Sequence, residues 1–314
     1  MHPWNRPILE SLRQRAGRLP HALLLHGVRG VGKLALAERI AQMLLCEAPA
    51  AARRPCDACA ACRWFRAGNH PDLRRLEPEA LAKDLPPDEE EAPARRAKKP
   101  SSEIKVDQVR ELAQFLNLGS HRGALRVALV HPAEAMNPNT QNALLKSLEE
   151  PPRGAMFILV SHAPARLLPT VRSRCQALPV GIPPLQAALD WLAQQGVKDA
   201  ERWLAYAGGA PLRALEYGGE AEILDRILRS PLPVDDREEL HRLAEALQKM
   251  ALDRAFSAFG LAPKYRTGVA AAKRAEARLW LSFARKMGQD RLLSQHEVNP
   301  KLFSAQMLIS RPKT

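Results

Sequence analysis

Short apolar runs alternate with helical periods over the first 180 or so residues of the chain. The strand candidates are residues 22–26, 73–77, 126–130, 156–160 and 176–180. Helical periods lie between them, most clearly at residues 33–45 and 106–118. A parallel sheet covered by helices has this alternation, so we predict an α/β domain over residues 1–182.

From residue 183 onward the pattern is helical to the end of the chain. We expect a small helical unit at residues 183–220 and a second all-helical unit at residues 221–314. The clearest helix starts near Asp235, with Glu238 three residues later as a capping-box-like pair. Its apolar positions are Leu240, Leu243, Leu247 and Met250. We interpret this stripe as core packing, and helix–helix oligomerisation is the functional alternative.

One segment, residues 78–103, does not fit either pattern. It is rich in proline and holds an acidic run at 88–91 and a basic run at 95–99. Such a segment cannot bury a core, so we predict a disordered surface insertion. A charged interaction tail is the alternative.

The chain carries a formal net charge of +13, which suits a partner with phosphates. No basic helix with interleaved aromatic residues appears, so direct reading of bases is not expected. There is no apolar run of about 18 residues, and the N-terminal segment lacks the apolar core of a secretory signal. We therefore expect a cytoplasmic protein.

A glycine-rich turn, "GVRGVGKL" at residues 27–34, lies between the first predicted strand and helix. Such a turn points backbone N–H groups at a phosphate, here through Gly27, Gly30 and Gly32, with Lys33 reaching the β and γ phosphates. The next residue normally supplies a hydroxyl to Mg²⁺, but Leu34 has no oxygen. A nucleotide-binding loop and a glycine turn packed on the sheet both remain open.

The acidic residues that an ATPase needs at the end of a neighbouring strand are also missing. The run at 126–130 is followed by His131 and Pro132. Neutral imidazole is a poor ligand for Mg²⁺ beside carboxylate oxygens. With two metal-handling positions lost, we expect no useful hydrolysis of ATP.

Four cysteines, Cys46, Cys56, Cys59 and Cys62, have the spacing C-x9-C-x2-C-x2-C. Two-residue gaps let successive thiolates face one ion, and zinc prefers four ligands in a tetrahedron. Four protein ligands leave no open position for water, so we predict a structural zinc. A redox dithiol is the alternative, while disulfides are disfavoured in the cytosol.

Arg172 and Arg174 precede the last predicted strand. Both could be ordinary surface charges. An arginine at this place in a nucleotide-binding sheet domain could instead project from the subunit edge towards a phosphate held by a neighbour. Cys175, beside them, is expected to serve packing.

The motifs "NALLKSLEEPP" (142–152) and "RSRC" (172–175) occur together with the cysteines and the glycine loop. Jointly they resemble the bacterial clamp loader, an AAA+ assembly of DNA polymerase III, closely over residues 20–182 and by architecture over 183–314. Asn137 is expected to cap the helix that bears the 142–152 motif. We interpret Glu149 and Glu150 as solvated acids, with partner contacts as the alternative.

The resemblance implies an AAA+ P-loop domain with a zinc module at 46–62, then a helical lid (183–220) and an all-helical collar (221–314). It implies a hetero-pentamer with tau/gamma ATPase subunits and the delta subunit, which opens the sliding clamp and places it on primed DNA. In that ring Arg174 would be an arginine finger in the ATP site of a neighbouring subunit.

Several departures favour the subunit type with a degenerate nucleotide site, which is not an enzyme by itself. Leu34 and His131-Pro132 are two of them, and Leu212 stands where the family has an arginine that senses the γ phosphate, with Arg213 following it. ATP or ADP could sit at residues 27–33 without being hydrolysed. The alternatives are an active tau/gamma-type ATPase and a zinc-dependent DNA-binding module.

Overall fold

The computed structural model describes residues 1–50, 53–81, 100–118, 125–270, 272–294 and 297–312. By its internal contacts the chain divides into two compact units, Met1–Ile182 and Pro183–Thr314. Most of the predicted insertion at 78–103, namely residues 82–99, lies outside the described residues. Among the described helices, each is too short or too polar to cross a lipid bilayer.

The first unit is built on a five-stranded parallel sheet with the strand order β2-β3-β4-β1-β5. The strands are β1 (Ala22–His26), β2 (Leu73–Leu76), β3 (Arg126–Val130), β4 (Ala155–Ser161) and β5 (Gln176–Pro179). Each of the predicted strands is confirmed to within one residue at either end. Every residue of β3 and β4 is buried, as expected for central strands covered on both faces.

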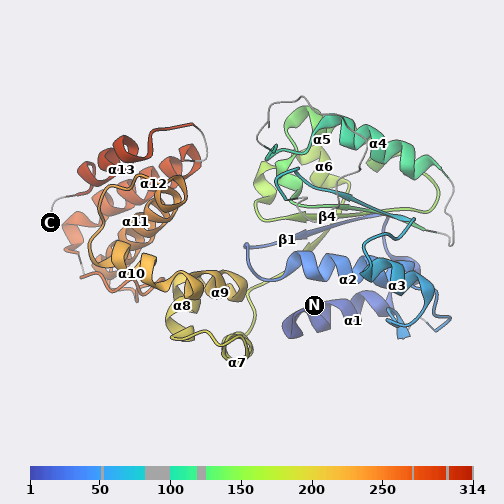
Figure 1. Cartoon of the computed structure of the whole chain (residues 1–314), viewed down its shortest axis with the longest axis horizontal. Coiled ribbons are helices and arrows are strands. Elements are labelled where there is room, and N and C mark those ends of the chain that lie inside the picture. Colours follow the sequence, from blue (N-terminus) through green and yellow to red (C-terminus); the bar gives the residue numbers. More distant parts are fainter. Residues whose placement is uncertain (51–52, 82–99, 119–124, 271, 295–296, 313–314) are drawn as a thin grey trace, which may run out of the picture. The chain divides into compact units, whose positions relative to one another are not determined.

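Helices cover both faces of this sheet (Figure 1). They are α1 (Arg6–Gln14), α2 (Lys33–Leu45), α3 (Ala60–Arg66), α4 (Val106–Asn117), α5 (Pro138–Glu149) and α6 (Pro169–Ser173). On one face, Phe157 and Leu159 of β4 share a core with residues of α4 and α5. Helix α2 packs on the other face, against β3 and β4. Since all strands run in parallel, their carboxyl ends meet at one edge.

The sequence of α5 explains both of its ends. The Asn137 side chain accepts a hydrogen bond from the Thr140 N–H at 3.0 Å, which confirms the predicted cap. Pro138 occupies the first turn, where a missing N–H costs nothing. At the other end, Pro151 and Pro152 prevent the helix from continuing.

The second unit is all-helical within its described residues. Its helices are α7 (Leu185–Gln194), α8 (Ala200–Tyr206), α9 (Pro211–Gly219), α10 (Ala221–Arg229), α11 (Arg237–Ala258), α12 (Ala277–Leu293) and α13 (Pro300–Ile309). One core gathers around Trp203 and Tyr217, and another lies between α11, α12 and α13.

The predicted start of α11 is wrong by one residue. Asp236, not Asp235, caps the helix, and its carboxylate accepts the N–H groups of Glu238 and Glu239 at 2.7 and 2.9 Å. Asp236 has the extended backbone that brings a carboxylate back over the first turn, whereas Asp235 pairs with Lys301. The predicted apolar stripe of α11 is buried as expected.

A buried carboxylate, Glu245 of α11, joins three helices of the second unit. It accepts hydrogen bonds from the Tyr217 hydroxyl at 2.7 Å and from Arg213 at 3.0 Å, both on α9. It also pairs with Lys249 at 3.2 Å and with Arg291 of α12 at 3.6 Å. Burial alone raises the pKa of Glu245, but these cations and the hydroxyl outweigh it and lower the pKa to about 2. The ionised carboxylate is therefore part of the fold.

We expect Glu245→Gln to reduce the free energy of unfolding by about 3–5 kcal/mol, because it leaves buried cations without their counter-charge. The lowered pKa also has a pH signature. The contribution of Glu245 is present above its ordinary pKa of 4.5 and disappears as the pH falls towards 2. Urea denaturation between pH 7 and pH 3 measures both effects.

Glu216→Gln is the matched control, since Glu216 also pairs with Arg213 but is 49% exposed. An exposed pair of this kind contributes about 0–1 kcal/mol. Equal destabilisation by the two substitutions would contradict the role of Glu245.

Candidate functional site

The glycine loop connects β1 to α2 and needs its glycines for two reasons. Gly27, Gly30 and Gly32 all have positive φ, at 150°, 89° and 80°. A Cβ on residue 27 would lie 2.2 Å from the Val180 carbonyl oxygen, and one on residue 32 would lie 2.3 Å from Cδ2 of His2. At residue 27 a side chain would force the backbone to shift, whereas at residue 32 it would displace the His2 side chain and require a φ of 80°, which other residue types rarely adopt.

Lys33, the first residue of α2, turns back onto its own loop. Its ammonium donates to the carbonyl oxygens of Gly27 at 2.8 Å and Val28 at 2.6 Å. The residue is only 2% exposed. The pKa of Lys33 is lowered to about 8. Burial is the main cause, Glu134 opposes it, and nearby Arg29 adds to it. The lysine predicted to reach phosphates thus has its charge satisfied inside the loop.

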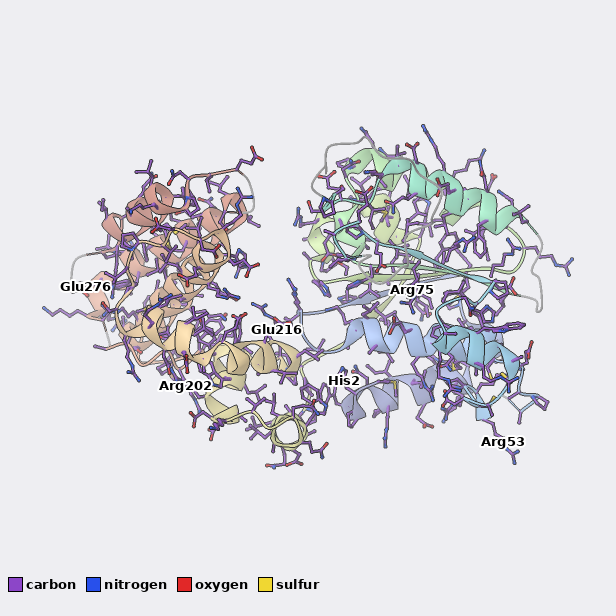
Figure 2. All side chains as sticks on the ribbon, viewed as in Figure 1. His2, Arg53, Arg75, Arg202, Glu216 and Glu276 are labelled. Atoms are coloured by element: carbon purple, nitrogen blue, oxygen red, sulfur yellow. The ribbon has the colours of Figure 1, made fainter. Side chains whose placement is uncertain are left out.

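The first residues of the chain also cover this loop, and no motif predicts this contact. The Trp4 indole N–H donates to the Val31 carbonyl at 3.0 Å, and the Asn5 amide donates to Val31 and Gly32 at 3.1 and 3.2 Å. His2 stacks on Trp4 with ring centroids 4.9 Å apart. Figure 2 labels His2 in this segment, beside α1 and α2.

Two histidines stand at the carboxyl ends of the central strands. His131 follows β3 and His162 follows β4, with ring centroids 5.4 Å apart. Glu134, in the segment after β3, accepts the backbone N–H of His162 at 2.8 Å. No sequence pattern singled out His162. Burial lowers the pKa of His131 to about 4 and that of His162 to about 3. Both imidazoles are therefore neutral at pH 7.

Leu34 and His131 supply no side-chain oxygen for a magnesium ion. Mg²⁺ takes oxygen ligands in near-octahedral geometry. Leu34 and His131 offer none where an ATPase has a hydroxyl and an acid, and one oxygen of Glu134 is already committed to a backbone N–H. The other oxygen of Glu134, Oε2, is buried and has no hydrogen-bond partner among the described residues.

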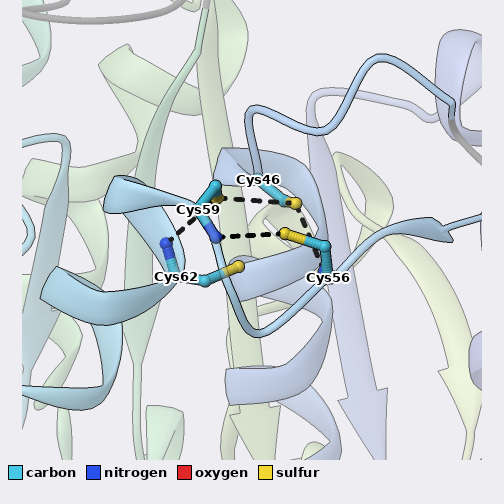
Figure 3. Close-up of side chains that lie close together, drawn as sticks. All are labelled: Cys46, Cys56, Cys59 and Cys62. Atoms are coloured by element: carbon cyan, nitrogen blue, oxygen red, sulfur yellow. Dashed lines mark hydrogen bonds between the residues drawn. The ribbon is translucent and has the colours of Figure 1, made fainter.

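The four predicted cysteine ligands come together in one cluster (Figure 3). Their sulfur atoms all lie within 4.8 Å of one another, and the Cys46 and Cys59 sulfurs are 3.9 Å apart. A tetrahedral zinc site with Zn–S bonds of about 2.3 Å requires sulfur atoms about 3.8 Å apart. The cluster could therefore hold a metal such as zinc with little rearrangement.

Backbone N–H groups point at the sulfurs of this cluster. Cys56 N–H donates to the Cys46 sulfur at 3.4 Å, Cys59 N–H to Cys56 at 3.3 Å, and Cys62 N–H to Cys59 at 3.4 Å. Such donors favour the thiolate, and those from Ala58 and Cys59 lower the pKa of Cys56 to about 6. Thiolates are the form that binds metal.

Arg174 caps the end of α6 and is one-third exposed. Its guanidinium lies 2.5 Å from the carboxylate of Glu149 and donates to the Thr170 carbonyl at 2.9 Å. The expectation that Glu149 is only a solvated acid is therefore wrong, because the end of α5 lies beside α6 and pairs the two residues. Neighbouring Cys175 is buried in the core, as packing requires.

Arg213 is engaged within its own unit. Its guanidinium bonds to the Tyr217 hydroxyl and pairs with Glu216 at 2.6 Å and Glu245 at 3.0 Å. Each of these partners lies on α9 or α11, so the charge of Arg213 is committed to packing those two helices together.

The comparison with protein families matches residues 6–183 to the model described as "DNA polymerase III, delta subunit". The chain is 43% identical to DNA polymerase III subunit delta prime of Pseudomonas aeruginosa over 224 residues, covering 70% of this chain and 62% of that protein. It is 34% identical to the delta prime subunit of Yersinia pestis over 254 residues, covering 80% and 68%.

The tau subunit of DNA polymerase III from Escherichia coli matches a shorter region. It is 33% identical over 159 residues, which cover 51% of this chain and 21% of that protein. The match to the Pseudomonas relative spans about three fifths of that protein's length.

For the cysteine cluster we expect about one zinc ion per purified chain. Cys59→Ser should release most of it and lower the unfolding temperature, because a three-thiolate site binds zinc more weakly. Elemental analysis together with thermal denaturation tests this. Cys175→Ser is the control, since Cys175 lies outside the cluster; an equal loss of zinc from both variants, or none from either, would contradict the assignment.

Proposed function

Because the chain belongs to the DNA polymerase III delta prime family, we propose that it is a clamp-loader subunit that binds into the ring but hydrolyses no ATP. Its partners would be tau/gamma ATPase subunits and the delta subunit in a hetero-pentamer. The assembly opens the sliding clamp and places it on primed DNA. Such an assembly acts in the cytoplasm.

The state of the glycine loop is the observation that carries this proposal. Lys33 is buried and bonded to two carbonyls of its own loop. Neither Leu34 nor His131 supplies an oxygen for a metal ion. An ATPase without its metal ligands loses the charge stabilisation on which phosphoryl transfer depends. ATP or ADP held at residues 27–33 would therefore stay intact.

Arg174 is the residue we propose to act on a neighbour's nucleotide. A guanidinium that is partly exposed and held by Glu149 can present its remaining donors outward in a fixed direction. Placed beside the triphosphate of an adjacent ATPase, it would stabilise the charge that spreads over the transferring phosphoryl group.

The other parts of the chain take supporting roles in this proposal. Four cysteines at 46–62 would hold a structural zinc ion, with no position left for a substrate. Residues 183–220 would form the lid and 221–314 the collar. The bonds of Glu245 to Arg213 and Arg291 would hold α9, α11 and α12 together as a rigid element.

An active tau/gamma-type ATPase is the second candidate, and one observation favours it. The loop keeps its three glycines, its lysine and their positive-φ geometry. A nucleotide could then bind if Lys33 exchanged its two carbonyls for phosphate oxygens. Hydrolysis would still require metal ligands that the loop does not offer.

We expect the isolated chain to release no phosphate from ATP above background at pH 7.5 with Mg²⁺, and Lys33→Ala to leave this rate unchanged. A steady-state ATPase assay measures it. Turnover that Lys33→Ala abolishes would establish the second candidate in place of the first.

In the reconstituted complex, Arg174→Ala should leave assembly intact but slow ATP hydrolysis at the neighbouring site by a factor of ~10³ or more, the usual contribution of an arginine finger. The DNA-stimulated ATPase rate of the complex would fall by the fraction that this site contributes to total hydrolysis. The rate of clamp loading would fall with it. Gel filtration, a phosphate-release assay and a clamp-loading assay report these steps.

Arg172→Ala is the control for that experiment, because Arg172 lies two residues away and is exposed. It should behave like the parent chain in all three assays. Unchanged loading with Arg174→Ala, or an equal defect with Arg172→Ala, would rule out the finger role.

A further inference from the structure

A single aspartate inside the cysteine cluster has an unusual backbone. Asp57 follows Cys56, the first member of the cysteine pair Cys56 and Cys59, and has a φ of 60°. Residues other than glycine rarely adopt this left-handed conformation. The resulting turn brings the Cys59 N–H to within 3.3 Å of the Cys56 sulfur. The metal-facing geometry of this pair therefore depends on the backbone of Asp57.

Side chains from α2 hold Asp57 in that conformation. Arg39 donates to both carboxylate oxygens in a two-pronged pair, at 2.6 and 2.7 Å. The Gln42 amide, which is almost fully buried, donates to one of the same oxygens at 3.0 Å and accepts from Arg39 at 2.8 Å. A planar guanidinium meeting a carboxylate in this way fixes direction as well as distance.

The main chain of Asp57 is held from another helix. Arg66 of α3 donates to the Asp57 carbonyl at 2.9 Å. The carboxylate and the carbonyl of one residue are thus bound to α2 and α3, respectively. Both helices are themselves connected to the cluster, because Cys46 directly follows α2 and Cys62 lies within α3.

Arg39, Gln42 and Cys46 occupy helical spacing along α2, so they share one side of that helix. Nine residues lie between Cys46 and Cys56, and closing such a loop costs entropy when both cysteines bind one ion. The contacts to Asp57 hold the second ligand segment at the end of α2 through side chains that are not themselves metal ligands. In addition, four thiolates around one Zn²⁺ carry a net charge of −2, and the neighbouring Arg39 guanidinium would partly neutralise it.

We propose that Arg39 and Asp57 are positioning residues of the metal site: their two-pronged pair presets the Cys56–Cys59 turn against Cys46 and so sets the affinity for zinc. This inference rests on the proposed zinc site. It concerns residues that bind no metal themselves, as outer hydrogen-bond partners of metal ligands commonly do.

The test measures the zinc dissociation constant of the full chain by competition with a chromophoric chelator under reducing conditions. Arg39→Gln and Asp57→Asn should each weaken zinc binding about 10–100-fold, the usual effect of removing such outer partners. Arg39→Lys should lose nearly as much as Arg39→Gln, because lysine keeps the charge but cannot form the two-pronged pair. Cobalt-loaded variants should retain the absorption spectrum of four-thiolate coordination.

Arg75→Gln is the matched control. Arg75 of β2 pairs at 3.1 Å with Glu38 of α2, the helix that also carries Arg39, and the exposure of the two pairs is similar. Among the described residues, the ion pair of Arg75 is with Glu38, which lies outside the cysteine loop. It should leave the zinc dissociation constant unchanged. Circular dichroism of each variant establishes that the fold is intact. Asp57→Asn is chosen because it removes the charge of the carboxylate while preserving the side-chain volume, which keeps the loop folded.

Four outcomes would overturn the inference. The first is that Arg39→Gln and Asp57→Asn both bind zinc within twofold of the affinity of the parent chain. The second is that Arg75→Gln loses as much zinc affinity as these two variants. Full retention of affinity by Arg39→Lys would show that charge, not the paired geometry, is what matters. If the parent chain itself binds no zinc, the inference and the proposed zinc site both fail, whereas tight zinc binding by the parent with unaffected variants rejects the inference alone.

Discussion

The burial of helix α2 against the sheet is the constraint on which both candidate sites depend. Leu36 and Ile40 are fully buried beneath the central strands. The helix begins at the glycine loop and ends next to Cys46, and its 13 residues span about 20 Å. Because close-packed apolar contacts hold it along its length, the glycine loop and Cys46 have a fixed separation.

Buried ionisable groups in this chain are accommodated in three different ways. The ammonium of Lys33 is satisfied by carbonyl groups of its own loop, and Glu245 is surrounded by cations and a hydroxyl. His131 instead loses its charge, since burial favours the neutral ring. The ammonium of Lys33 is consequently engaged within the glycine loop, although the sequence of that loop has the composition of a phosphate-binding turn.

The arginines show why net charge is a poor guide to a free basic surface. The chain has a formal charge of +13, yet Arg39, Arg174 and Arg213 are each paired with a carboxylate from another element. A planar guanidinium favours such directed pairing. These three side chains therefore organise the cysteine loop, the end of α6 and the helical unit, and their charge is partly neutralised within the fold.

Local patterns in the sequence determined the strands, the glycine loop, the cap of α5 and the cysteine ligands, because apolar period, turn chemistry and short ligand spacing act over a few residues. Tertiary structure alone decided which side chains meet: Glu149 beside Arg174, Asn5 on Gly32, and Asp57 on Arg39. The members of these pairs are 18 to 27 residues apart, and nothing local links them. Only the packing of helices on the sheet brings them together. A contact between residues this far apart in sequence can form only after the chain between them has folded.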